Sequence, residues 1–273
     1  MARLTQVLQP HPPGSPLRLT DAMATPPAGL PTKEKLEDAL EDLRKRLQAL
    51  QAALGAEAKR AVLVVFQGRD ASGKDGAIRR VFGGLDPARC TVTSFKRPSL
   101  LELSHDYLWR VHQAIPVRGS IGVFNRSHYE DVIAVRIHRI AAEAVWRKRF
   151  GHINAFEAML ADEGVVIRKF FLHISKEEQR QRLEERLSDP EKNWKFAAGD
   201  LEERTKWDEY SAAYEEVLER CSTDYAPWYL VPAHRNKPRD LLVLEVLVRT
   251  LELMNPQFPP ADPSVLALRG TIR

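Results

Sequence analysis

A glycine-rich segment that follows directly on an apolar run constrains this chain more than any other feature. The run covers residues 61–66, and the segment after it reads Gly68-Arg69-Asp70-Ala71-Ser72-Gly73-Lys74-Asp75-Gly76. The spacing G-x-x-x-x-G-K is that of a P-loop, in which a strand leads into a turn whose backbone N–H groups hold phosphate oxygens. A helix that starts at Lys74 directs the positive end of its dipole at the same anion. The pattern therefore predicts a strand, a phosphate-binding turn and a helix. The alternative is a glycine-rich turn that only joins the two elements.

We expect the turn to contact a chain of phosphates through its backbone, with Lys74 as a catalytic cation. The predicted contact residues of the turn are Gly68, Ala71, Ser72, Gly73, Asp75 and Gly76.

The segment departs from the usual P-loop in its carboxylates. A Ser or Thr normally follows the lysine and binds Mg²⁺ through its hydroxyl, but here that position is Asp75. A second carboxylate, Asp70, lies inside the loop, where it is costly unless a cation neutralises it. Because Mg²⁺ prefers oxygen ligands and keeps several waters, we hypothesise that Asp70 is catalytic and helps to hold Mg²⁺.

Composition limits the class of protein. The chain has 273 residues, 44% of them hydrophobic, which suits one large α/β domain with an appended lid. A formal charge of +4 gives no indication of a nucleic-acid partner. The two cysteines, Cys90 and Cys221, lack metal-ligand spacing and are expected to be free thiols in a reducing cytoplasm. No apolar run is long enough for a membrane helix, and no signal peptide is recognisable.

The spacing of apolar and turn residues predicts how the chain is organised. Residues 1–31 are rich in proline and predict a flexible, extended arm, and residues 32–273 form a single domain. A leucine stripe over 36–54 predicts a helix that docks on the sheet, with a short coiled coil as the alternative. We expect strands over 61–67, 91–95, 119–124, 165–174 and 228–231, and helices over 74–84, 101–113, 129–149, 152–163, 176–187, 200–221 and 238–253.

Alternating strands and helices predict a parallel sheet covered by helices on both faces, a three-layer α/β fold. In such sheets the ligand binds at the carboxyl ends of the strands. The P-loop, Lys96 with Arg97, and Asn125 with Arg126 each follow a predicted strand. We therefore expect these segments to converge on one crevice, where Lys96 and Asn125 contact phosphate or nucleotide.

Polar residues after the third predicted strand form a second constellation. Arg126 is predicted to stabilise charge on a transferring phosphoryl group. Asp131 is our preferred second Mg²⁺ ligand and catalytic carboxylate, with Glu130 as its competitor. The alternative is structural, with Asn125 and Ser127 capping a helix and the acids complementing its dipole.

The third constellation lies within a predicted lid over about 176–205. Arg182 and Arg186 are four residues apart and share a helix face, and Lys192 and Lys195 follow in a basic loop. Such residues can meet phosphate when a lid closes and expels water. The alternative is a solvated helix with ion pairs along its surface.

Several stretches, taken together, resemble the polyphosphate kinase 2 family. They are 68–76, 105–110, 119–131, 169–179, 193–195 and 228–233, in the order found in that family. The P-loop with Asp75 after the lysine, combined with Asn125-Arg126-Ser127-His128-Tyr129-Glu130-Asp131, is a specific pair of motifs.

The resemblance implies Mg²⁺-dependent transfer of phosphoryl groups between inorganic polyphosphate and a nucleotide, on a P-loop kinase-like fold with a lid. It implies that Asp70 and Asp131 are the metal-side carboxylates, and that Lys74, Arg126 and Arg186 contact phosphates, with Arg182 as a further lid contact. The family forms dimers and tetramers, so a homodimer or homotetramer is expected.

The resemblance is closest to members that act on AMP and ADP, so adenine nucleotides are the expected partners, with guanine nucleotides as an alternative. One departure is the segment Asn236-Lys237-Pro238-Arg239, which lacks an aromatic residue common in the family. Two rival readings stay open at this point. One is an ATP-dependent nucleoside or nucleotide kinase, and the other is a non-catalytic P-loop protein that binds polyphosphate.

Overall fold

Five parallel strands form the centre of the computed structural model, which describes residues 8–196, 198–269 and 271. The strands are β1 (Ala61–Gln67), β2 (Cys90–Ser94), β3 (Ile121–Asn125), β4 (Val165–His173) and β5 (Trp228–Pro232), in the order β2-β3-β1-β4-β5. All four neighbouring pairs run parallel. The central strand β1 is buried along its whole length, as its continuous apolar run predicts.

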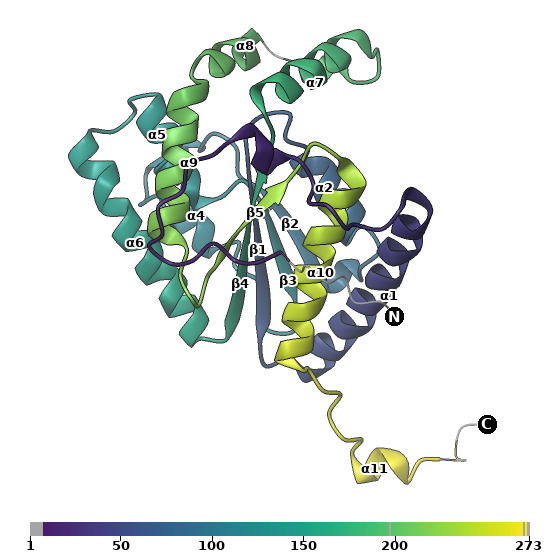
Figure 1. Cartoon of the computed structure of the whole chain (residues 1–273). Helices are drawn as coiled ribbons and strands as arrows, with labels where there is room; N and C mark the ends of the chain where they lie inside the picture. The colour runs from purple at the N-terminus through teal and green to yellow at the C-terminus, as the bar shows by residue number, and fades with distance from the viewer. Residues whose placement is uncertain (1–7, 197, 270, 272–273) are drawn as a thin grey trace.

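Helices cover both faces of the sheet, which confirms the predicted three-layer α/β architecture (Figure 1). One face carries α1 (Lys33–Glu57), α2 (Lys74–Phe82) and α10 (Asn236–Met254), and the leucine stripe of α1 packs into the apolar core on that side. The other face carries α6 (Glu143–Asp162) and α9 (Trp207–Cys221), which enclose a second apolar core. The chain leaves β1 toward one side of the sheet and β3 toward the other, so the strand order reverses between these two neighbours. A crevice for a ligand is expected at such a point, between the loops that follow the carboxyl ends of β1 and β3.

The shorter elements complete the chain. They are η1 (Asp21–Ala24), η2 (Pro87–Arg89), α3 (Leu100–Leu103), α4 (Trp109–His112), η3 (His128–Asp131), α5 (Ala134–Ile137), α7 (Lys176–Ser188), η4 (Asn193–Lys195), α8 (Ala198–Thr205) and α11 (Pro263–Leu266). Figure 1 shows α7 and α8 above the carboxyl edge of the sheet, where the lid was predicted. No helix of the described residues has the length and apolar character needed to cross a lipid bilayer.

Several predicted helices are wrong in their extent. The helix expected over 101–113 is split into α3 and α4, because the Asp106 carboxylate accepts from the Leu108 N–H and favours a turn. The helices expected over 129–149 and 152–163 are instead η3, α5 and one long helix, α6. The helix expected over 200–221 is broken at Lys206 into α8 and α9.

The N-terminal segment lies along the surface of the same chain. The His11 N–H donates to the Trp228 carbonyl (2.7 Å), and the Leu19 N–H donates to Glu215 Oε1 (2.7 Å). The His173 ring donates to the Thr20 carbonyl (2.9 Å). The sequence predicted a flexible arm over 1–31; within it, residues 8–31 are mostly extended and attached to the domain, and residues 1–7 lie outside the described part.

Candidate active site

The turn between β1 and α2 has the backbone geometry of a phosphate-binding loop. Gly68, Ala71 and Gly73 have φ angles of +153°, +63° and +90°, which turn successive N–H groups toward one side. A Cβ atom at Gly68 would come within 2.7 Å of the Leu172 carbonyl oxygen, so glycine is required there. Ser72 is buried, and Gly76 lies in the first turn of α2 beside Arg80. The predicted strand, turn and helix are therefore all present.

Lys74 lies inside this turn. Its Nζ donates to the carbonyl oxygens of Gly68 (2.6 Å) and Arg69 (3.1 Å), and only 8% of the residue is exposed. Burial, together with the positive charge of Arg126, lowers the pKa of Lys74 to about 8. The carboxylates of Asp70, Glu130 and Asp75 offset this only in part, and an arriving phosphate would add further negative charge.

This pKa predicts how phosphate binding depends on pH. As the pH rises through about 8, Lys74 loses its proton in the ligand-free protein, so its attraction for an anion fades. We expect the affinity for tripolyphosphate to be highest below pH 8 and to fall above it, with proton uptake on binding. Calorimetry in two buffers of different ionisation enthalpy measures both quantities. Lys74→Met serves as the control that should flatten the profile, and an affinity of wild type that is constant from pH 7 to 9.5 would contradict the prediction.

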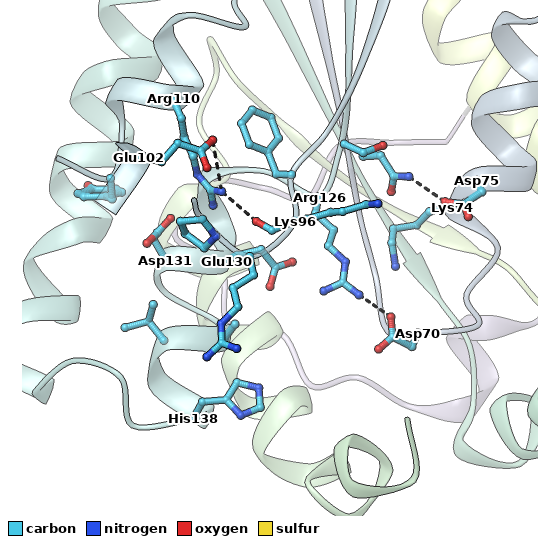
Figure 2. Close-up of a pocket in the computed structure, with 18 of the residues that line it drawn as sticks. Asp70, Lys74, Asp75, Lys96, Glu102, Arg110, Arg126, Glu130, Asp131 and His138 are labelled. Atoms are coloured by element: carbon cyan, nitrogen blue, oxygen red, sulfur yellow. Dashed lines mark hydrogen bonds and ion pairs between the residues drawn. The ribbon is translucent and has the colours of Figure 1, made fainter. Parts of the chain in front are cut away.

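Arg126 and Asp70 face each other across the loop edge (Figure 2). Arg126 Nη2 donates to Asp70 Oδ1 at 2.5 Å, and both side chains are partly exposed. Burial acts to raise the pKa of Asp70, but the charges of Lys74, Arg126 and Arg186 outweigh it, so the pKa is lowered. Next to them, Asn125 Nδ2 donates to Asp75 Oδ1 at 2.8 Å. The loops after β1 and β3 are therefore joined by two side-chain bridges.

The two acidic candidates after β3 point in different directions. The Asp131 carboxylate accepts from Arg149 Nη1 at 3.1 Å, and burial raises its pKa although Arg149 opposes this. The negative charge of Glu130 is instead the main cause that raises the pKa of Arg126. The same charge also acts to raise the pKa of Lys74. Figure 2 shows Asp131 and Asp70 on opposite sides of Arg126 and Glu130. Both acids line the same cleft, but Glu130 lies toward Arg126, whereas the preferred Asp131 is paired with Arg149.

These carboxylates are the groups that could hold a metal ion at this site. Among the described residues, no group of three or more His, Cys, Asp or Glu side chains is arranged to hold one metal ion. Mg²⁺ does not need such a cage, since it commonly uses one or two carboxylates together with waters and substrate phosphates. Asp70, partly exposed beside the phosphate loop, fits that role. Asp131 does not lie with Asp70 in this arrangement.

The site opens into one large cleft of about 2400 Å³. Its walls come from the P-loop, the segment after β2, the segment after β3 and the lid, so the predicted convergence is confirmed. Its basic lining residues are Lys74, Arg79, Arg80, Lys96, Arg97, Arg110, Arg126, Lys148, Arg149, Arg182, Arg186 and Lys192. This lining suits a ligand that carries many negative charges along its length.

The basic residues of the predicted lid segment differ in their contacts, since Arg182 bonds to the backbone of the P-loop while Arg186 and Lys192 pair with acidic residues. Arg182 donates to the carbonyl oxygens of Ala71 (3.0 Å) and Ala233 (2.6 Å), so it fastens the P-loop to the end of β5. Arg186 lies 3.5 Å from Asp200 and lines the cleft. Lys192 is exposed and pairs with Asp189, and the side chain of Lys195 lies outside the described part.

Sequence reasoning missed a buried arginine under the P-loop. Arg239 on α10 is fully buried, and a Cβ atom at Gly73 would come within 2.4 Å of its Nη1. Arg239 pairs with Asp240, whose other oxygen accepts from Arg80 on α2 at 2.5 Å. In the sequence, the segment 236–239 stands out only because it lacks an aromatic residue, and no local pattern shows that α10 meets the P-loop. Lys237 in the same segment pairs with Glu37 on α1.

Comparison with known proteins gives consistent matches. The profile of the polyphosphate kinase 2 (PPK2) family matches residues 31–259. An AMP/ADP-polyphosphate phosphotransferase from Meiothermus ruber is 55% identical over 230 residues, covering 84% of this chain and 86% of that protein. An ADP-polyphosphate phosphotransferase from Rhodopseudomonas palustris is 46% identical over 245 residues, covering 85% of each. The crystal structure of polyphosphate kinase 2 from Arthrobacter aurescens TC1 superposes with a TM-score of 0.88 at 36% identity, covering 97% of this chain and 98% of that one.

Proposed function

The chain belongs to the polyphosphate kinase 2 family, and from this we propose that it transfers phosphoryl groups between inorganic polyphosphate and the adenine nucleotides AMP and ADP. The observation that carries the proposal is that Lys74, Arg126 and Asp70 line one large cleft together with many other basic residues. The relative with 55% identity is named for both AMP and ADP, which favours both acceptors here.

The main obstacle to this reaction is repulsion between two polyanions. The terminal phosphate of the nucleotide and the end of the polyphosphate would meet over the P-loop, where Lys74 and Arg126 offset their charge. The attacking oxygen is a phosphate oxygen that is already ionised near neutral pH, so a strong general base is less necessary. Catalysis is then mostly positioning and electrostatic stabilisation of the transferring group.

We propose Asp70 as the side chain that holds Mg²⁺, which would supply further charge neutralisation on the phosphate oxygens. A second carboxylate could help Asp70 to hold the metal ion. Glu130 is favoured for this role, because its negative charge acts on Arg126 more strongly than that of any other acid. Asp131, our first choice from the sequence, is less favoured because its Oδ1 pairs with Arg149.

The lid over about 176–205 is proposed to close on the polymer. Arg186 on α7 lines the cleft, and Lys192 follows on the exposed loop, with Lys195 beyond it. Lys96, from the segment after β2, lines the same cleft. These basic residues would follow the polyphosphate chain, while Arg182, which also lines the cleft, ties the P-loop to the end of β5.

A basic channel of this kind predicts strong salt dependence. Raising the ionic strength from about 0.05 M to 0.5 M shortens the screening length severalfold, so the KM for long-chain polyphosphate should rise by about tenfold or more. Steady-state kinetics over a salt series at fixed nucleotide concentration measures it. A KM that stays flat over this range would contradict the channel.

Self-association is also proposed, as a homodimer or homotetramer in the cytoplasm. The exposed leucines Leu100, Leu101 and Leu103 on α3 lie next in sequence to the edge strand β2 and offer an apolar contact. Sedimentation velocity of the full chain measures the assembly.

Turnover of AMP and ADP, each with long-chain polyphosphate and Mg²⁺, tests the proposed function. Chromatography should show ADP and then ATP formed from AMP, and ATP formed from ADP. Product from ADP alone would restrict the substrate range, and guanine nucleotides are run beside them. Activity only with ATP as donor would favour the rival nucleotide kinase.

A further inference from the structure

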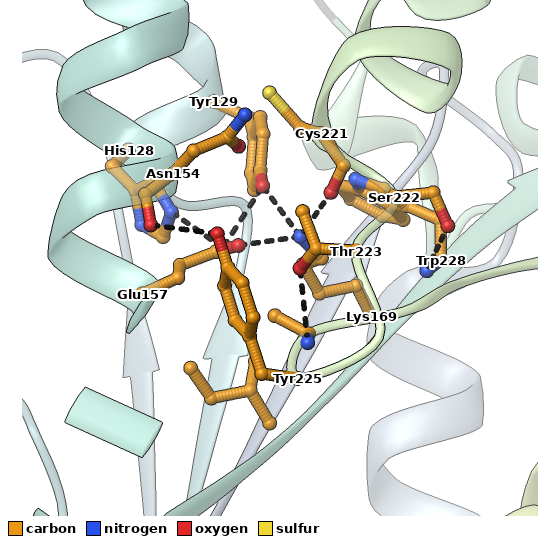
Figure 3. A network of polar contacts seen from close by, with 12 residues as sticks. His128, Tyr129, Asn154, Glu157, Lys169, Cys221, Ser222, Thr223, Tyr225 and Trp228 are labelled. Carbon is orange, nitrogen blue, oxygen red and sulfur yellow. Dashed lines mark hydrogen bonds and ion pairs between the residues drawn. The ribbon is translucent and has the colours of Figure 1, made fainter. Parts of the chain in front are cut away.

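Figure 3 shows a cluster of polar side chains that includes Tyr129, the residue before Glu130 in the sequence. Lys169 on β4, Glu157 on α6 and Tyr129 on η3 are all fully buried. Lys169 Nζ donates to Glu157 Oε2 (2.5 Å), the Tyr129 hydroxyl (2.7 Å) and the Cys221 carbonyl (2.6 Å). An ammonium has three N–H donors, and here each has a partner.

Glu157 connects this lysine to the segment after β3. Its Oε1 accepts from the Tyr129 hydroxyl (2.9 Å) and lies 3.1 Å from His128 Nε2. Burial acts to raise the pKa of Glu157, but the charge of Lys169 and the hydrogen bond from His128 outweigh it, so the pKa is lowered. Lys169 and Glu157 therefore form an ion pair inside the protein.

Such a pair is a poor way to gain stability. Removing two charges from water is costly, and well-packed apolar residues of similar volume often serve as well or better. None of the side chains of Tyr129, Glu157 and Lys169 lines the cleft, so the cluster does not contact a ligand there. What the cluster does is join one short segment to β4, α6 and the end of α9.

That segment has little structure of its own. η3 is a single 3₁₀ turn, and Arg126 just before it has a left-handed backbone with φ +61°. A non-glycine residue in this conformation is strained and persists only when its surroundings fix it. On one side, the Arg126 N–H donates to the Phe66 carbonyl (3.0 Å). On the other side, the segment is held by Tyr129. The ring of Tyr129 also packs against Trp228, with 4.9 Å between the two ring centroids.

We infer that Tyr129, Glu157 and Lys169 are positioning residues, which anchor the segment after β3 so that Arg126 and Glu130 face the phosphate site. This inference rests on the proposed function of that site. A displacement of about 1 Å in a group that aligns reacting atoms can cost about 10²-fold in rate.

Tyr129→Phe tests the role with the least disturbance. It keeps the ring, the Lys169–Glu157 pair and the contact of Glu157 with His128, and removes the Tyr129 hydroxyl, the group through which both members of the pair bond to Tyr129. We expect kcat to fall about tenfold, with the KM for polyphosphate within about twofold of wild type. Hydrogen exchange at the amides of residues 126–131 should become faster, which is a readout independent of activity.

A triple variant, Tyr129→Phe with Glu157→Leu and Lys169→Met, removes the ion pair and the Tyr129 hydroxyl without leaving either charge of the pair stranded, although His128 loses its Glu157 partner. The unfolding midpoint should stay near that of wild type, while kcat falls about 10²-fold. Tyr225→Phe is the matched control, because Tyr225 lies in the same region but its hydroxyl donates to the Asn154 carbonyl and not to η3. That variant should keep the wild-type kcat.

The outcomes separate this inference from the proposed function. Wild-type kcat and unchanged exchange in Tyr129→Phe would overturn the positioning role, even if the triple variant does not fold. A wild-type chain that transfers no phosphoryl group would refute the proposed function, and the exchange rates would still decide whether the cluster anchors the segment.

Discussion

The Arg126→Ala enzyme is expected to transfer phosphoryl groups at least about 10³-fold more slowly than wild type. An arginine that stabilises charge on a transferring phosphoryl group is commonly worth 10³–10⁵ in kcat. Arg126 is placed for this, since it lies between Asp70 and Glu130 at the edge of the P-loop. Its strained backbone, φ +61°, is consistent with a position that the fold holds for function.

Steady-state kinetics at saturating polyphosphate and nucleotide measures this loss. Arg126→Lys keeps the charge but loses the planar fork, so it should recover only part of the rate. Arg118→Ala is the matched control, because Arg118 is an exposed arginine paired with Glu163. Loss of less than tenfold in Arg126→Ala would contradict the role assigned to it.

Asp70→Asn is expected to lower kcat by about 10²–10³-fold while polyphosphate binds as well as before or better. The substitution keeps the shape of the side chain but removes a negative charge from the phosphate site. Because Asp70 is proposed to hold Mg²⁺, the Mg²⁺ concentration for half-maximal rate should also rise.

This variant separates an enzyme from a protein that only binds polyphosphate. A sensor would gain affinity and have no turnover to lose, whereas a catalyst loses turnover and keeps binding. Calorimetry with tripolyphosphate and initial rates measure the two quantities. Glu163→Gln, at an exposed carboxylate, is the control that should leave both unchanged. Wild-type turnover in Asp70→Asn would remove this carboxylate from the mechanism.

The sheet and the P-loop were predictable because their signals are local. The apolar run of β1, the glycine spacing after it and the apolar residues of β3 and β4 appear within short windows of sequence. Parallel strands place their carboxyl ends at one edge, so the convergence of Asp70, Lys96 and Arg126 on one cleft followed from topology alone.

The details of the site depend on contacts between distant residues. Whether Glu130 or Asp131 faces the phosphate is decided by the turn at η3 and by Arg149, which belongs to α6. Arg182 was predicted to meet phosphate, but its guanidinium also holds the backbone at Ala71. No periodicity in the sequence shows either arrangement.

The buried polar residues were the hardest to predict. In the sequence, Lys169 is a single charged residue within an apolar strand. Its ion pair with Glu157 and its hydrogen bond to Tyr129 form only when the chain folds. The contact of Arg239 with the P-loop at Gly73 is likewise visible only in the folded structure. Tertiary packing, rather than local propensity, determines these groups.

The most direct test of the central claim follows the phosphoryl group itself. Polyphosphate labelled with ³²P is incubated with unlabelled AMP, Mg²⁺ and the full chain, and the nucleotides are then separated. The account predicts that the label enters the β-phosphate of ADP first and the γ-phosphate of ATP later. Unlabelled nucleotides after complete incubation, or label transfer that occurs only with labelled ATP as donor, would contradict it.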